Sequence, residues 1–122
     1  MSRGDKMFRF EDLEVWQRAA DLALSLDDVA DQLEQQRRYR YAEQLRAAAL
    51  SISNNIAEGS GSTSTNEFRN FLNFARRSAF ECANMLLVFH RKQLPPSDKT
   101  RPLLVELNEI CRMITALSRS LE

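Results

Sequence analysis

EDLEVWQRAADLALSLDDVADQLE, residues 11–34, has an apolar side chain at every third or fourth position. Because an α-helix turns by about 100° per residue, side chains at this spacing lie along one face of the helix. The stretch therefore predicts an amphipathic helix over residues 11–34. Its apolar face consists of Val15, Ala19, Leu22, Leu26, Val29 and Leu33.

Two further segments with the same periodicity follow along the chain. The first predicts a helix over residues 39–58, which ends where Gly59 can adopt the left-handed conformation common after helices. The second predicts a helix over residues 65–92. It begins with a capping box, in which the Ser64 hydroxyl and the Glu67 carboxylate each accept a hydrogen bond from the other residue's amide.

A fourth helix is predicted over residues 99–121. The third helix must stop before Pro95 and Pro96, which lack amide donors, and Pro102 fits only in the first turn of the fourth helix. No segment alternates apolar and polar residues as a half-buried strand would. The sequence therefore predicts an all-α protein, an antiparallel up-down-up-down four-helix bundle in which residues 1–122 form one domain.

The scarcity of certain residue types argues against catalysis. Three glycines cannot supply a dinucleotide fingerprint or a phosphate-binding loop, and one histidine with two cysteines falls short of a zinc set. The histidine, His90, has no glutamate three positions before it, so the di-iron bundle motif is missing. We therefore expect no enzymatic activity, no catalytic residues, no metal and no cofactor.

The apolar segments are too short for a membrane span or for the apolar region of a secretory signal. We therefore expect a cytoplasmic protein without a membrane partner. In that compartment Cys82 and Cys111, which both fall on predicted apolar helix faces, are expected to be reduced thiols in the core.

The first helix is more apolar than one buried face requires. A second apolar set lies beside the face already described and widens the apolar arc to roughly 220°. We expect this set to contact a second subunit in a homo-oligomer, with the large indole of Trp16 as its anchor. The alternative is that Trp16 covers the monomer core beneath residues 8–10. The residues predicted at the subunit interface are Leu13, Trp16, Ala20 and Leu24.

Charge is balanced overall but divided along the chain. Residues 1–36 hold nine acidic and four basic side chains, and residues 37–92 hold nine basic and four acidic ones. Separated blocks of this kind can attract a polyanion to one face or can pair the faces of neighbouring subunits. The sequence leaves both interpretations open.

The arginines of the second and third predicted helices suggest a binding face. Arginine donates hydrogen bonds to phosphate, and Phe80, in the same sector of the third helix, can stack on an unpaired base. We therefore predict contact with RNA or DNA through a basic face of these two helices. The alternative is a structural or scaffold protein whose charges join subunits and bind a protein partner. The predicted nucleic-acid residues are Arg37, Arg38, Arg40, Arg46, Arg69, Arg76, Arg77 and Arg91.

Polar residues at the edges of the apolar faces predict a link between the second and third helices. Asn55 and Glu58 lie on the second helix, and Ser78 and Glu81 lie on the third. Their side chains are expected to form hydrogen bonds that fix the register of the two helices.

Three pieces of the sequence resemble a known family. They are FEDLEVWQ (residues 10–17), QLRAAALSISNNIAEG (residues 44–59), and the spacing of Phe71-Leu72, Ala75, Ser78 and Glu81. The family comprises the four-helix-bundle proteins encoded in bacterial 23S rRNA intervening sequences, related to the accessory variability determinant of diversity-generating retroelements.

The resemblance implies an antiparallel four-helix protomer that assembles into a ring, usually a homopentamer, and has no known enzymatic activity. For the retroelement relatives it implies a basic surface that binds nucleic acid and a reverse transcriptase. Two features depart from the family pattern. Arg77 stands where a glycine is common, and the turn at residues 35–40 lacks the usual proline or glycine.

Overall fold

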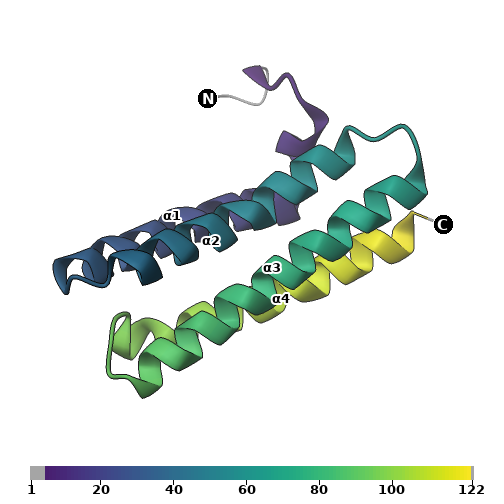
Figure 1. Cartoon of the computed structure of the whole chain (residues 1–122). Coiled ribbons are helices and arrows are strands. Elements are labelled where there is room, and N and C mark those ends of the chain that lie inside the picture. Colours follow the sequence, from purple (N-terminus) through teal and green to yellow (C-terminus); the bar gives the residue numbers. More distant parts are fainter. Residues whose placement is uncertain (1–4, 122) are drawn as a thin grey trace.

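The computed structural model describes residues 5–121 and contains four long α-helices in this range (Figure 1). Two short 3₁₀ helices precede α1 and α4, and no strand occurs in the described part of the chain. The all-α prediction is therefore confirmed. The elements are η2 (Arg9–Asp12), α1 (Glu14–Gln35), α2 (Tyr39–Ser60), α3 (Thr65–Arg91), η3 (Ser97–Lys99) and α4 (Thr100–Ser120).

The four helices run alternately up and down, as predicted. In Figure 1 the turn between α1 and α2 lies at the same end as the turn between α3 and α4, and the α2–α3 loop lies at the opposite end, beside the C-terminus. Helix α2 packs on α1 and on α3, and α3 packs on α4. The molecule therefore consists of two helical hairpins, α1/α2 and α3/α4, joined along α2 and α3.

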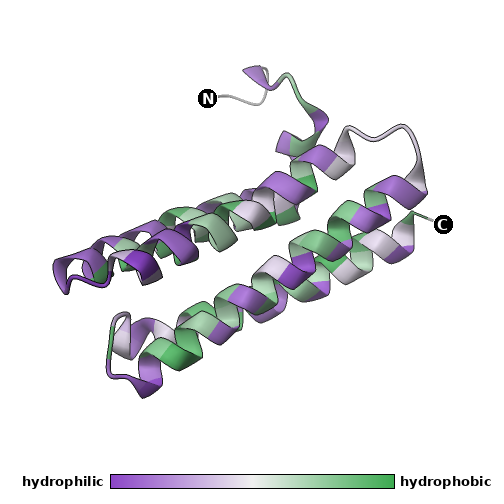
Figure 2. Cartoon of the chain, in the orientation of Figure 1, coloured by the Kyte–Doolittle hydropathy of each residue, from purple (hydrophilic) through white to green (hydrophobic). Residues whose placement is uncertain are grey.

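The predicted apolar faces form the core between these helices. Every residue named for the face of the first helix is buried, and α2, α3 and α4 contribute fully buried side chains such as Ile52, Leu72 and Ile110. The end of the α1/α2 hairpin is different: Figure 2 shows a hydrophilic α1–α2 turn, and residues 35–40 are exposed to solvent. Apolar burial thus determines which face of each helix points inward.

The turns of both hairpins have the same backbone conformation. After α1, Arg37 has φ 63°, and the amides of Arg37 and Arg38 donate to the carbonyls of Glu34 and Leu33. After α3, Gln93 has φ 63°, and the amides of Gln93 and Leu94 donate in the same way to His90 and Phe89. Both are Schellman motifs, which explains how the α1–α2 turn forms without glycine or proline.

Gly59 has a different role from the predicted one. Helix α2 continues through Gly59 to Ser60, and no glycine among the described residues has a positive φ. A Cβ atom on Gly59 would lie 2.7 Å from the Cβ of Phe71 and 2.8 Å from the Cδ1 of Phe68. The prediction of a left-handed cap was therefore wrong, because this glycine instead allows α2 and α3 to approach each other closely.

The helix starts also differ in part from expectation. The Ser64 hydroxyl accepts a hydrogen bond of 3.1 Å from the Glu67 amide at the start of α3, as predicted. Helix α1 begins at Glu14 instead of residue 11, because the Glu11 carboxylate accepts from the amides of Met7 and Phe8 and supports a separate 3₁₀ turn.

Candidate nucleic-acid interface

The structure divides the eight predicted arginines among separate places. Arg37, Arg38 and Arg40 are exposed at the α1–α2 turn, at the end of the bundle far from the α2–α3 loop. Arg46 lies on α2, and the other four lie along α3. The eight arginines therefore do not form the one continuous face of α2 and α3 that the sequence predicts.

Arg46 is bound by three carboxylates of α1. Its Nε donates to Asp27 at 2.7 Å, its Nη2 to Asp31 at 2.5 Å and its Nη1 to Glu34 at 3.0 Å. These bonds, led by the one to Glu34 and followed by the one to Asp27, raise the pKa of Arg46 above its usual range. Three negative charges around one positive charge leave this surface acidic, so Arg46 tightens the α1/α2 hairpin and does not present free charge.

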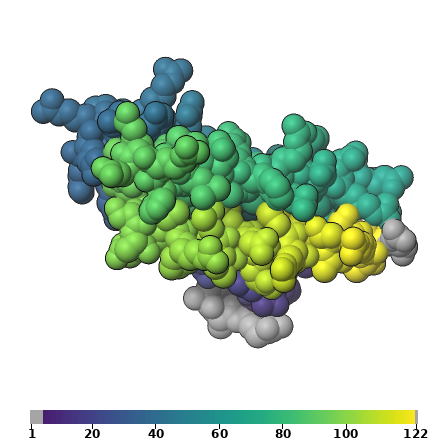
Figure 3. All heavy atoms as spheres, turned by 90° about the horizontal axis from the view of Figure 1, so that it is seen from below, coloured from purple at the N-terminus to yellow at the C-terminus, as the bar shows by residue number. Residues whose placement is uncertain are grey.

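Two arginines of α3 instead face two arginines of α4. Arg69 and Arg76 line adjoining depressions of about 330 and 390 Å³ between these helices, together with Arg112 and Arg119. Figure 3 shows α3 and α4 lying side by side along this face. We call the surface formed by Arg69, Arg76, Arg112 and Arg119 the α3/α4 arginine groove.

The α3/α4 arginine groove is polar and carries no negative charge among its described lining residues. Its other polar side chains are neutral, and include Asn73, Asn108 and Thr115. In residues 5–121, ion pairs involve only Lys6, Arg18 and Arg46 as the cation. The four positive charges of the groove are thus available to an anionic ligand.

Arg69 is held in place by neutral acceptors of the described chain. Its Nη1 donates to the Asn66 side chain at 2.8 Å, and its Nε and Nη2 donate to the carbonyls of Ser118 and Leu121 at 3.4 and 3.2 Å. The two carbonyls lie at the C-terminal end of α4, where a positive charge is favourable. These neutral acceptors fix the guanidinium at one end of the groove.

Arg76 lies in the middle of the groove beside an aromatic ring. Its guanidinium carbon is 4.9 Å from the centroid of the Phe80 ring, which is a cation–π contact. The same guanidinium lowers the pKa of the Cys111 thiol, although burial outweighs this effect and leaves the pKa raised. Arg76 therefore lies close enough to the buried Cys111 of α4 for its charge to act on that thiol.

Sequence reasoning missed Arg112 and Arg119. They stand seven residues apart on α4, as Arg69 and Arg76 do on α3, so each pair spans about 10 Å along its helix. That spacing was visible in the sequence. The arrangement of α3 beside α4, which turns the two pairs toward each other, was the missing information.

Arg77 and Arg91 are exposed on α3 but do not line the groove. Arg77 lines a separate depression of about 630 Å³ that reaches α2. There the Ser78 hydroxyl donates to the Ser51 hydroxyl at 2.9 Å, and the Asn55 amide donates to the same oxygen at 3.0 Å. The predicted link between α2 and α3 is therefore confirmed for Asn55 and Ser78, with Ser51 as the member that sequence reasoning missed. Glu58 and Glu81 were wrongly included, because within residues 5–121 their side chains form no hydrogen bond across this contact.

The predicted interface residues of α1 differ in exposure. Leu13, Trp16 and Ala20 are half-buried, whereas Leu24 is 69% exposed. The ring of Trp16 contacts that of Phe10 edge to face, with 5.0 Å between centroids. The N-terminal segment thus covers part of this apolar set, and Leu24 lies outside that cover.

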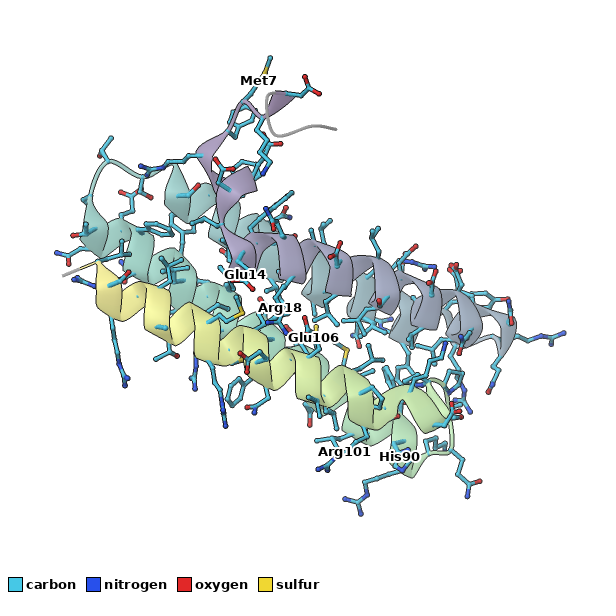
Figure 4. The ribbon with its side chains drawn as sticks, turned by 180° about the vertical axis from the view of Figure 1, so that it is seen from behind. Met7, Glu14, Arg18, His90, Arg101 and Glu106 are labelled. Atoms are coloured by element: carbon cyan, nitrogen blue, oxygen red, sulfur yellow. The ribbon has the colours of Figure 1, made fainter. Side chains whose placement is uncertain are left out.

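One ion pair ties α1 to α4 across the bundle. The Nε of Arg18 donates to the Glu106 carboxylate at 3.0 Å, and its Nη2 donates to the other carboxylate oxygen. Figure 4 shows these two side chains pointing toward each other between the helices, while Arg101 extends from α4 away from α1. The α1-facing side of α4 is thus electrostatically paired, unlike the side that forms the groove.

Comparison with known proteins identifies the family. The model of the 23S rRNA-intervening sequence protein family matches residues 11–116. The chain belongs to this family. One similar solved structure is the crystal structure of a protein of unknown function from the S23 ribosomal protein family of Bacteroides thetaiotaomicron VPI-5482, with a TM-score of 0.81, 21% identity, and coverage of 85% of this chain and 97% of that one. No curated protein matches.

These relatives support the fold of the family and name no enzymatic activity. Among residues 5–121, no cluster of three or more His, Cys, Asp or Glu residues could hold a metal ion. No helix within that range is long and apolar enough to cross a bilayer. Cys82 and Cys111 are buried free thiols, and burial raises the pKa of Cys82 to about 12.

Proposed function

We propose that this 23S rRNA-intervening sequence protein is a noncatalytic protein that binds RNA or DNA through the α3/α4 arginine groove. The observation that carries the proposal is the meeting of four arginines from two helices, with no carboxylate among the described residues that line the groove. Guanidinium groups at this density attract a polyanion and form paired hydrogen bonds with phosphate oxygens. The proposal also fits the relation to retroelement accessory proteins that the sequence resemblance implies.

Charge reversal tests the proposal. Arg112→Glu with Arg119→Glu should weaken binding of a mixed-sequence RNA by at least about tenfold, since two phosphate contacts are lost and two repulsive charges are added. A filter-binding titration measures this change. The matched control is Arg37→Glu with Arg40→Glu, which reverses two exposed arginines at the far end of the bundle. Equal loss in both variants, or absent binding by the unaltered protein, would overturn the proposal.

We further propose that the protein is a homo-oligomer, a pentamer as the family resemblance implies, in which α1 contributes to the subunit contact. Exposed Leu24 supports this, because it lies on the same helix as the half-buried residues Trp16 and Ala20 and adds exposed apolar surface to α1. Light scattering should report a mass above 14.1 kDa that falls in Trp16→Ala. An unchanged mass in that variant would contradict the predicted contact.

The alternative function is a structural or scaffold role, in which the groove pairs with a neighbouring subunit or a protein partner. The acidic surface around Arg46 supplies a complementary charge that favours it. In that case Arg112→Glu with Arg119→Glu should dissociate the oligomer, and no RNA binding should be detected at any salt concentration.

A further inference from the structure

Phe80 is an exposed aromatic side chain at the edge of the α3/α4 arginine groove. The side chain is 57% exposed and lines the same depression as Arg76 and Arg112. A phenylalanine this exposed on a helix contributes little to the core, and its ring is accessible to a ligand. Packing in the core therefore does not explain why this position is a phenylalanine.

Two arginines lie near the Phe80 ring. The Arg76 guanidinium lies over the ring, and Arg77 lines a depression that Phe80 also lines. The one acidic residue among the described residues of that second depression is Glu81. An aromatic ring close to two arginines combines a stacking surface with donors for phosphate.

We propose that the α3/α4 arginine groove binds single-stranded nucleic acid and that Phe80 stacks on one unpaired base. This inference rests on the proposed function and specifies its ligand. Within a duplex the faces of the bases are covered by their neighbours, whereas in a single strand a base can turn out and stack on an aromatic side chain. The arginines on both helices then contact the phosphates that flank the stacked base.

The test compares a 12-nucleotide single-stranded RNA with a duplex of the same sequence, using fluorescence anisotropy. Phe80→Ala should weaken single-strand binding by about 5- to 100-fold, the range expected for one base–aromatic stack. It should leave duplex binding unchanged. Phe80→Tyr should retain binding, because tyrosine keeps the ring.

Leu87→Ala is the matched control. Leu87 lies on the same helix and is 49% exposed, but it lines neither the α3/α4 arginine groove nor the depression that Phe80 shares with Arg77. Its loss should leave the affinity for both RNAs unchanged. Equal effects of Leu87→Ala and Phe80→Ala would overturn the inference, because they would indicate a general effect of removing exposed apolar surface.

A base analogue reports stacking directly. A single-stranded RNA with 2-aminopurine at successive positions should show quenched fluorescence at one position on binding, and the quenching should disappear in Phe80→Ala. Tight binding to both RNAs without any effect of Phe80→Ala would overturn base stacking while nucleic-acid binding stands. Absence of binding to both RNAs and to the DNA strands of the same sequence would overturn the proposed function itself.

Discussion

Arginine behaves differently in the two hairpins of this molecule. In the α1/α2 hairpin, Arg46 faces three carboxylates and is fully occupied by them. In the α3/α4 hairpin, Arg69 and Arg76 line the same groove as Arg112 and Arg119, and no carboxylate within residues 5–121 lines it. Arginine thus links the two helices of the α1/α2 hairpin through ion pairs, whereas in the α3/α4 hairpin it forms a positively charged surface for a polyanion.

The difference arises from what the neighbouring helix contributes. Helix α1 places Asp27, Asp31 and Glu34 on the side that meets α2. The two carboxylates of α4, Glu106 and Glu109, instead act on Arg18 of α1, and both raise its pKa. Whether an arginine can bind a ligand therefore depends less on its own helix than on the charges that the neighbouring helix presents to it.

The largest expected effect concerns the seam that joins the two hairpins. Gly59→Ala should lower the free energy of unfolding by about 1–3 kcal/mol, because the added Cβ meets Phe68 and Phe71 in a close-packed region. Urea denaturation measures the loss. The control is Gly61→Ala, whose Cβ would lie 3.5 Å from the Glu58 carbonyl, an ordinary contact. Similar stability in the two variants would show that the close approach of α2 and α3 does not matter.

The second prediction separates stabilising from ligand-binding arginines. Arg46→Met should lower the melting temperature, because Asp27, Asp31 and Glu34 then repel one another without their cation. The loss should be smaller in 1 M NaCl, where surface charges are screened. Arg112→Met is the matched change in the other hairpin and should leave the melting temperature unchanged. Equal thermal shifts in both variants would remove the contrast between the hairpins.

The third prediction concerns the turn that both hairpins share. Arg37→Gly and Gln93→Gly should each raise the free energy of unfolding by about 0.5–1 kcal/mol, since a left-handed residue other than glycine costs on the order of 1 kcal/mol. Chemical denaturation measures the gain. Lys92→Gly serves as a control with φ −87° and should lose stability. A loss at all three positions would contradict the strain assigned to Arg37 and Gln93.

The smallest effect uses a thiol to detect the charge of Arg76. Burial raises the pKa of Cys111, and Arg76 partly opposes this. Arg76→Gln should therefore raise the pKa further, and Cys111 should react more slowly with a disulfide reagent at pH 8, since the thiolate is the reactive form. Arg77→Gln, which changes the adjacent residue, should leave the rate unchanged. A faster reaction in Arg76→Gln would contradict the position of its charge.

The sequence was sufficient for the fold because helical periodicity is a local property. The stripe from Val15 to Leu33 is buried as predicted, and Ser64 caps α3 as predicted. Gly59 was misinterpreted for a related reason: a glycine near the end of an apolar stripe is typical of a helix cap. Only the packing of Phe68 and Phe71 against it reveals the close approach.

The candidate site depended on contacts between helices and was predicted only in part. Arg69 and Arg76 were identified from their shared sector on α3, but Arg46 was placed with them because its partners lie 12 to 19 residues away on α1. Arg119 and Arg112 were missed since α4 had been considered only for its apolar face. Which charged side chains of a helix are free to bind a ligand cannot be predicted until the helix packed against it is known.

The salt dependence of single-stranded RNA binding tests the central claim most directly. If the four arginines of the α3/α4 arginine groove each neutralise a phosphate, the logarithm of the association constant should fall with the logarithm of salt concentration with a slope of about −3. Arg112→Gln should make that slope shallower by about 0.7, and Arg46→Gln should leave it unchanged. A slope near zero, or an equal change in both variants, would contradict the claim that the α3/α4 seam, and not the α1/α2 seam, presents free positive charge.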